Sequence, residues 1–542
     1  MTSTDLRRPT AGVGLLTGFA ARRERVRTPL AVVALPVLVG VTGAAMASLY
    51  PDAAAREALR SGAADNPAFR LLLGPLGGDT SAAAITTWRV GLFLALVAGI
   101  LVALTVIRNS RAEEDAGRGE LVRAGAVAPT APMLVAAAVA TTVGVALGIV
   151  TACATAVVGA SAASAVMVGV GYVTVTAAAV GVAAIADQVF ATARAAGVAA
   201  VTVLAGGYVL RGVGDLVDGF TWLRWVSPVG WVELIDPFGQ RRVLPVVAGV
   251  TVGVVGVAVA AAVARRRDLG EGLLVRRAGP AGSRRLRGAG ALEARVSAPT
   301  IAPWVSATAA YCLLLGFLLS SVGDLVPSSG GVTDIVRDLG GGGALAEAVM
   351  TAVLGFVGVI AGLAGVAVVV RARADETAGR TEQILATATS RSRLFLSTAA
   401  AALGASVAVI VAASVAVAVA HAAGAGTSAV PDIGTVLGAG AVQIPGTLLV
   451  VAVGVAAYGC RPRFVAAGWA AVLGDMLLAQ FGELFSLPSW VRDLAPHTHV
   501  SGMTPGHVGL TAPIVSLVVA AALLGLGWWG FGRRDIVGAG GG

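Results

Sequence analysis

The chain has 542 residues, of which 56% are hydrophobic and only 13% are charged. Soluble domains carry roughly 25% charged residues, so this composition excludes an ordinary soluble domain and indicates a polytopic membrane protein. All 39 basic residues are Arg, against 30 acidic residues, which gives a formal charge of +9. We interpret this excess as an orientation signal of a membrane protein, and no nucleic-acid surface is needed to explain it.

Apolar runs long enough to cross a bilayer core about 30 Å thick recur along the chain. In lipid, such runs satisfy their backbone groups only as helices. Residues 12–27 are expected to form an interfacial helix, and the run after it is too long for a cleavable signal peptide. The predicted spans of the first half are 30–50, 86–107, 131–158, 163–186, 195–213 and 243–264. Those of the second half are 301–322, 347–370, 394–421, 433–458, 464–484 and 510–531.

This layout predicts an all-α protein of about twelve transmembrane helices in two homologous six-helix halves. With both termini in the cytoplasm, 29 of the 39 Arg lie inside, as the positive-inside rule requires. We therefore expect a multi-pass protein of the bacterial plasma membrane with both termini cytoplasmic. Its expected segments are an N-terminal cytoplasmic segment (1–29), the first half (30–264), an Arg- and Gly-rich cytoplasmic linker (265–300), the second half (301–532) and a cytoplasmic tail (533–542).

A ten-residue motif occurs twice, as RAEEDAGRGE from Arg111 and as RADETAGRTE from Arg373, each directly after an apolar run. Seven positions are identical, and such a repeat indicates a duplicated chain. The spacing predicts one i,i+4 ion pair per copy, between Glu114 and Arg118 and between Glu376 and Arg380. A solvated helix with local ion pairs would explain each copy, but duplication in a charge-poor chain favours a surface that docks a soluble partner twice.

A second repeated block precedes the last span of each half, as GDLVDGFTWLRWVSP from Gly214 and GELFSLPSWVRDLAP from Gly482. Trp, Arg and Pro recur there at one constant offset, and we expect two short half-helices that re-enter the outer interface in each half. An ordinary aromatic belt that anchors the following span is the alternative. The matched residues are Trp222, Arg224, Pro228 and Pro237 in the first half and Trp490, Arg492, Pro496 and Pro505 in the second.

The repeated acidic motif between spans 2 and 3, six spans per half and a Pro-containing loop before the last span resemble the permease of a type-2 ABC exporter. The fused double length is similar to the actinobacterial polyketide-antibiotic and tetronasin exporter permeases. This resemblance implies a type V-like transmembrane fold and a coupling helix seated on a separate ATPase subunit. Two ATPase copies would carry ATP and Mg, with no cofactor in this chain. The carried-over residues are Glu113, Glu114, Arg118, Glu120, Asp375, Glu376, Arg380 and Glu382.

The two copies of the motif differ where Asp115 becomes Thr377 and Arg123 becomes Leu385, so the two contacts need not be equally strong. A P-loop requires a Lys, and this chain has none, so ATP hydrolysis must come from a partner. His497, His499 and His507 share one loop, yet no set of acidic or Cys ligands completes a metal site, and we expect loop histidines.

Two other classes of protein are alternatives to the exporter permease. A secondary transporter driven by protons or ions would use Asp475, the acid best placed within a span. A membrane-embedded transferase would use clustered outer acids, but Asp215, Asp218, Glu233 and Asp236 are dispersed in the sequence.

The sequence is interpreted as an exporter of bulky amphipathic compounds such as antibiotics, with hydrophobic small molecules and membrane lipid as its contacts. We expect aromatic surfaces to bind such cargo. Phe93 and Phe356, in spans 2 and 8, are the candidates for that surface; helix packing or lipid contact is the alternative role for both.

Overall fold

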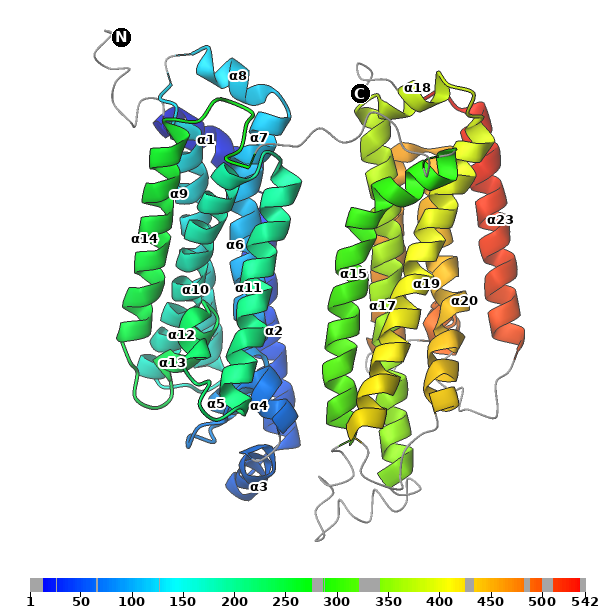
Figure 1. Cartoon of the computed structure of the whole chain (residues 1–542). Coiled ribbons are helices and arrows are strands. Elements are labelled where there is room, and N and C mark those ends of the chain that lie inside the picture. The colour runs from blue at the N-terminus through cyan, green and yellow to red at the C-terminus, as the bar shows by residue number, and fades with distance from the viewer. Residues whose placement is uncertain are drawn as a thin grey trace. The chain divides into compact units, whose positions relative to one another are not determined.

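The structure is a computed structural model that describes residues 13–25, 27–64, 67–125, 127–274, 286, 288–320, 342–424, 433–481, 488–499 and 510–536. The chain divides into two compact units, Met1–Gly279 and Pro280–Gly542, called unit 1 and unit 2 below. Every regular element in the described residues is helical. Each unit is a helical bundle and is described by itself (Figure 1).

Unit 1 contains six long helices, with short helices at both ends. Its elements are α1 (Val13–Glu24), α2 (Arg27–Leu49), α3 (Ala53–Ala64), α4 (Pro67–Leu73), α5 (Ala82–Thr86), the π-helical turn η2 (Thr87–Gly91), α6 (Leu92–Asn109), α7 (Arg111–Asp115), α8 (Arg118–Arg123), α9 (Ala131–Val157), α10 (Ala162–Val189), α11 (Ala193–Leu216), α12 (Leu223–Val226), α13 (Gly230–Ile235) and α14 (Leu244–Ala264).

Unit 2 repeats the order of long helices in unit 1. Its elements are α15 (Ala289–Ser320), α17 (Gly342–Thr377), α18 (Arg380–Leu385), α19 (Arg391–Gly424), α20 (Ile433–Cys460), the 3-10 turn η4 (Pro462–Phe464), α21 (Ala467–Phe481), α22 (Ser489–Arg492), the 3-10 turn η5 (Pro496–His499) and α23 (Thr511–Arg533).

Eleven helices in the described residues are long and apolar enough to cross a membrane. They coincide with eleven of the twelve predicted spans, which confirms the polytopic all-α fold class. The twelfth prediction, 301–322, falls on α15 as far as its last described residue. The span predicted at 86–107 is longer than expected, because α5, η2, α6 and α7 form one continuous segment, Ala82–Asp115.

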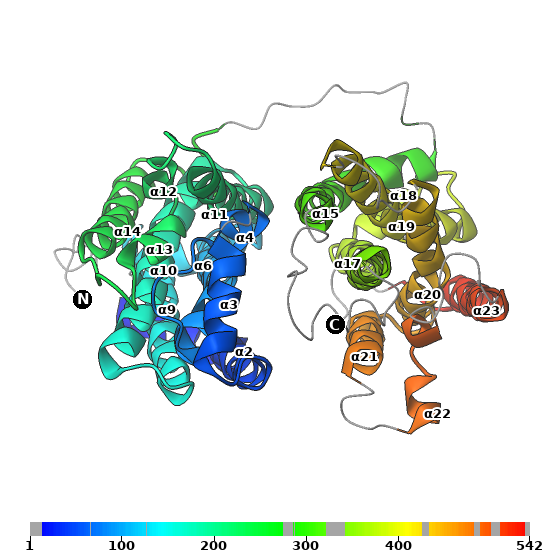
Figure 2. The ribbon, with the colours of Figure 1, turned by 90° about the horizontal axis from the view of Figure 1, so that it is seen from below.

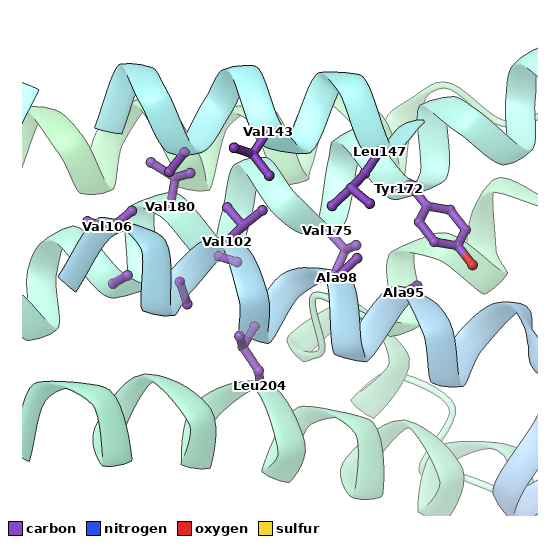
Figure 3. Packing of buried hydrophobic residues seen from close by; sticks show 14 of the residues in the cluster. Ala95, Ala98, Val102, Val106, Val143, Leu147, Tyr172, Val175, Val180 and Leu204 are labelled. Carbon is purple, nitrogen blue, oxygen red and sulfur yellow. The ribbon is translucent and has the colours of Figure 1, made fainter. Parts of the chain in front are cut away.

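The core of unit 1 lies where α6, α9, α10 and α11 face one another, with α10 as the most enclosed of the long helices (Figure 2). Figure 3 shows apolar side chains packed between them, including Ala98 and Val102 from α6, Val143 from α9 and Leu204 from α11. Lipid tails are as apolar as these side chains, so close packing between helices, more than the hydrophobic effect, stabilises such a core.

Glycines bring the last helix of each unit against the fourth long helix. A Cβ on Gly181 of α10 would lie 2.4 Å from Val252 O and 2.9 Å from the Cα of Gly253 in α14. In unit 2, a Cβ on Gly459 of α20 would lie 2.2 Å from Gly527 O in α23. Backbones approach this closely only where both helices carry small residues, so the same contact holds α10 to α14 and α20 to α23.

The two ends of each bundle differ in what they carry. In unit 1, α1, α7 and α8 lie at one end, and α4, α5, α12 and α13 lie at the other (Figure 1). In unit 2, α18 follows the end of α17, while α22 and η5 follow the opposite end of α21. We call the end with the repeated motif the motif end and the opposite one the loop end.

Candidate functional site

The repeated motif folds as a helix, a tight turn and a short second helix in both units. The turn is made by Gly117 in unit 1 and by Gly379 in unit 2, whose φ angles are 72° and 73°. A side chain beyond glycine is disfavoured in this left-handed conformation. The two glycines therefore end α7 and α17 and start α8 and α18 in the same geometry, which explains their place in the motif.

The exposed ion pair of each motif crosses this turn. Arg118 donates to Glu113 at 2.6 and 2.8 Å, and Arg380 donates to Asp375 at 2.8 and 2.6 Å. The predicted i,i+4 pairs are therefore wrong, because the glycine turn interrupts the helix and brings the residue five positions earlier within reach.

Glu114 and Glu376 instead anchor the motif inside each unit. Arg267, which follows α14, donates to Glu114 at 2.8 and 2.9 Å. Arg534, which follows α23, donates to both oxygens of Glu376, from Nη1 at 2.6 Å and from Nη2 at 2.8 Å. Glu376 has no exposed surface and Glu114 little, so these two acids cannot themselves contact a soluble partner.

A buried Arg completes the anchor in unit 1. Arg111 has no exposed surface, and its guanidinium donates to the carbonyl oxygens of Asp187 and Glu271 and to Glu114 Oε2 at 2.7 to 3.0 Å. The Asp187 carboxylate accepts from Ser110 Oγ at 2.6 Å and from the Arg111 amide at 2.9 Å. The start of the motif is thus fixed to the end of α10 by charge-assisted hydrogen bonds.

A further pair of acids ties the helix before the first span of each unit to the motif. Glu24 of α1, 3% exposed, accepts from Arg108 at 2.8 and 2.9 Å and from Asn109 at 3.0 Å. In unit 2, Glu293 of α15 pairs with Arg371. Sequence reasoning missed both acids. The available signal was an acid shortly before each first predicted span, Glu24 before 30–50 and Glu293 before 301–322.

The accessible face of each motif is therefore smaller than the predicted set. Of the predicted residues, Arg118 and Glu120 are exposed in unit 1, and Arg380 and Glu382 are exposed in unit 2; Glu113 and Asp375 are half-buried beneath their Arg partners. Leu121 adds an apolar side chain, 76% exposed, where the second copy has Gln383. Each motif thus has an exposed Arg beside one half-buried and one exposed acid, and a buried Glu–Arg pair holds these residues in place. Such a surface suits contact with a polar protein surface.

The predicted half-helices at the loop end correspond to α12 and α13 in unit 1 and to α22 and η5 in unit 2. Trp222 and Trp490 are exposed by 56% and 69%, Pro228 is buried, and Pro237, Pro496 and Arg492 are half-buried. Pro505 and His507 lie outside the described residues. Whether these segments enter a bilayer stays a prediction.

Arg224 belongs to a buried charge network that the sequence did not suggest. Arg211 has no exposed surface, and Asp215 lies 2.8 Å from both Arg211 Nη1 and Arg224 Nε. Glu233 lies farther away, 3.2 Å from Arg211 and 3.5 Å from Arg224. Asp215 and Glu233 looked dispersed in the sequence, but α11 and α13 bring them to the same two Arg residues, while Asp218 is exposed.

Asp475 in α21 is paired with a loop histidine. His497 Nδ1 lies 2.5 Å from Asp475 Oδ2, and His497 Nε2 lies 3.3 Å from the hydroxyl of Thr447 in α20. All three are buried. The sequence did not predict the pairing of His497, in the turn η5, with Asp475, and His499 is exposed. Within the described part of the chain, no group of three His, Cys, Asp or Glu residues could hold a metal ion.

The two phenylalanines proposed for the cargo surface lie on the outside of their own units. Phe93 is 56% exposed and Phe356 is 48% exposed. Neither lines a described cavity within its unit, so their role stays a prediction.

Together, the fold and the duplicated motif define a multi-pass, all-α membrane protein built from two repeated halves, an architecture suited to a permease. The family model described as "Multidrug efflux system permease Rv1217c, C-terminal domain" matches residues 14–265 and 286–532. Multidrug efflux system permease protein Rv1217c of Mycobacterium tuberculosis (strain ATCC 25618 / H37Rv) is 32% identical over 534 residues, which cover 97% of this chain and 95% of that protein. The chain belongs to this family of multidrug efflux permeases.

Proposed function

We propose that the chain is the membrane-embedded permease of an ATP-driven exporter of bulky amphipathic compounds, and that two ATPase subunits dock on it, one on each copy of the motif. The observation that carries the proposal is the identical construction of the two motifs. Each presents an exposed Arg in a pair with an acid across a glycine turn, above a buried Glu–Arg anchor. The printed name of the relative supports efflux of several compounds as the function.

The anchors give the motif a mechanical role in this proposal. Exposed ion pairs contribute little to folding, so their duplication is better explained by a partner than by stability. The buried anchors connect the motif of unit 1 to α10 and to Arg267, shortly after α14, and the motif of unit 2 to Arg534, directly after α23. Force from an ATPase on α8 or α18 would therefore reach the long helices. ATP and Mg would be held by the ATPase, since this chain has no Lys for a P-loop.

The Arg distribution supports a cytoplasmic position for the motif ends. With this orientation 29 of the 39 Arg face the cytoplasm, including Arg118 and Arg380. Both copies of the motif are then on the side that holds ATP. We further infer a place in the bacterial plasma membrane with both termini cytoplasmic, and a relation to the fused double-length exporters of polyketide antibiotics.

A carrier driven by a proton or cation gradient is the second candidate, and the buried pair of Asp475 and His497 favours it. Titratable groups within a membrane domain commonly mark ion pathways. However, the corresponding part of unit 1 holds Arg-paired acids in place of an Asp–His pair, so the pair is not part of a repeated device. We therefore assign it a structural role.

Efflux from proteoliposomes distinguishes the two candidates. The chain and its ATPase are reconstituted together, ATP is supplied, and an uncoupler collapses the proton gradient. The ATP-driven exporter should keep its efflux rate under these conditions and lose it when ATP is withheld. Efflux that stops with the gradient in the presence of ATP would contradict the proposal and support the carrier.

A further inference from the structure

Unit 1 has a cavity of about 350 Å³ at its loop end. It is lined by the loop after α4, by α5 and η2, by α10, and by α13 with the turn that follows it; α4, α5 and α13 are seen together at this end in Figure 1. The volume lies within the range of small-molecule sites. None of the motif residues contributes to the cavity, so it has no part in the docking proposed above.

Aromatic side chains in fixed positions line the cavity. Trp88 and Tyr172 are 8% and 1% exposed, and both are held by hydrogen bonds. Trp88 Nε1 donates to Gly74 O at 2.9 Å, and the Tyr172 hydroxyl donates to Gly91 O at 3.1 Å. Phe238 adds a third ring. Rings that are already immobilised bind a ligand without a further loss of side-chain entropy.

Besides Trp88 and Tyr172, the polar side chains on the cavity wall are three acids and the Thr87 hydroxyl. Asp79, Glu233 and Asp236 line it, and no Arg or His is among its lining residues. Thr87 Oγ1, in the π-helical turn, is buried and has no hydrogen-bond partner in the described structure. Turns of this kind are frequent at functional sites. The wall therefore offers negative charge and acceptor oxygens beside apolar surface.

Glu233 is the least neutralised member of its network. The two Arg residues approach Asp215 to 2.8 Å but stay 3.2 and 3.5 Å from Glu233. Burial, and then the nearby Asp215 carboxylate, raise the pKa of Glu233 to about 7. This residue lies in α13, outside the eleven candidate spans. Another positive charge on its cavity side would stabilise the ionised carboxylate.

We propose that this cavity binds an organic cation with an apolar, aromatic body, such as a quaternary ammonium or phosphonium ion. The charged centre lies beside Glu233, and the apolar body packs on Trp88 and Tyr172. A cation is attracted both by a carboxylate and by the faces of aromatic rings, and the attraction is strongest where water is excluded. An anion of the same shape would meet three acids and no basic side chain. Binding needs neither ATP nor a partner, so its failure would leave the proposed export function untouched.

Equilibrium dialysis of the purified full chain in detergent tests the site, with tetraphenylphosphonium as the cation and tetraphenylborate as the anion of the same shape. Detergent without protein gives the background. We expect saturable binding of one tetraphenylphosphonium per chain and no saturable binding of tetraphenylborate. Equal binding of the two ions would overturn the proposal.

Three variants locate the site. Glu233→Gln should weaken tetraphenylphosphonium binding at least tenfold, and Val168→Phe, which fills the cavity from α10 without a change of charge, should abolish it. Asp218→Asn, an exposed acid at the same end, should bind like the wild type. Wild-type affinity in folded Glu233→Gln and Val168→Phe would overturn the assignment. If either variant fails to fold, the comparison of the two ions in the wild-type chain decides.

The pH dependence of cation affinity gives a second test, which uses only the wild-type chain. Arg211 and Asp215 from α11 and Arg224 from α12 act electrostatically on Glu233, and Asp79, Asp236 and Tyr172 share its cavity. Because the cation binds the ionised form, and the pKa lies at about 7, affinity should rise about tenfold from pH 6 to pH 8. A pH-independent affinity in the wild-type chain would contradict the role of Glu233.

Discussion

Burial decides which acids of the motif can serve a partner. Glu113 and Glu114 are adjacent in the sequence, yet one forms an ion pair at the surface and the other is locked onto Arg111 and Arg267. The same division holds for Asp375 and Glu376 in unit 2. A charge reversal at Glu114 or Glu376 would therefore damage the fold, and docking is better tested at the exposed residues.

Glu376→Gln should lower the stability of the chain strongly. The substitution leaves Arg534, whose side chain is 11% exposed, without its counter-charge, and breaking a buried pair from one side costs about 3–5 kcal/mol. The measurement is the thermal unfolding midpoint of the purified chain in detergent. Glu382→Gln, an exposed acid of the same motif, is the matched control and should leave the midpoint unchanged. Equal midpoints for both variants would show that Glu376 is no anchor.

The motif shows how far sequence reasoning reaches at the scale of single residues. The repeat identified the right segment and the right residue types, because identical letters recur at one offset. The partners were misassigned because helical spacing was extended across Gly117, where the backbone turns. Sequence reasoning missed four partners, because each lies 78 to 158 residues along the chain from the residue it pairs with, and only the fold brings them together. These are Arg267, Arg534, Glu24 and Glu293.

At the scale of elements, the glycine turn sets the geometry of the docking surface. A Cβ at Gly117 would meet no atom within 4 Å, so any effect of a substitution arises from the backbone conformation alone. The left-handed conformation of Gly117 costs a residue with a side chain about 1–2 kcal/mol.

Gly117→Ala should therefore shift α8, weaken the Arg118–Glu113 pair and reduce ATPase binding several-fold, with only a small loss of thermal stability. Binding of the ATPase to the reconstituted chain is the measurement. Gly404→Ala is the control, since it lies within α19, has ordinary helical φ and open space around it, and should bind the ATPase normally. Normal binding by Gly117→Ala would show that the turn does not position the surface.

The pair of Asp475 and His497 joins η5 to α21, and Thr447 extends this connection to α20. Asp475→Asn and His497→Gln should each lower the unfolding midpoint, since each leaves a buried polar group without its partner, at a cost of about 1–3 kcal/mol. The double variant should lose much less than the sum, because the second change removes a group that is already unpaired.

ATP-driven efflux is the readout that separates structure from ion coupling for this pair. A folded Asp475→Asn chain should retain most of its efflux with ATP and its ATPase. Additive losses of stability in the double variant would contradict the structural role, and abolished efflux in a folded single variant would favour ion coupling.

Elements were predicted more reliably than sites. Eleven spans follow from apolar runs alone, because lipid permits little besides helices. The short helices α12, α13 and α22 could be expected from Pro and Trp positions, but not the meeting of Asp215 with Glu233. That meeting depends on the angle at which α13 returns against α11, and no residue pattern encodes such an angle plainly.

At the scale of the whole molecule, the motif ends of the two units are built alike, whereas their loop ends differ. Both motif ends have a glycine turn, a surface ion pair and a buried Glu–Arg anchor. The loop end of unit 1 has the Arg–acid network and the cavity, while that of unit 2 has the Asp–His pair. The two units are thus alike at the end where an ATPase partner is proposed to dock. They differ at the loop end, where a small molecule is proposed to bind in unit 1.

The stoichiometry of the complex tests the central claim most directly. The chain is co-expressed with its ATPase, purified in detergent, and weighed by native mass spectrometry. We predict two ATPase copies per chain for the wild type, and one copy each for the variants Arg118→Glu and Arg380→Glu, which reverse an exposed charge in one motif. Arg242→Glu, an exposed change at the loop end, should retain two copies. A wild-type complex with a single ATPase, or two copies retained when both motifs are reversed together, would contradict the account.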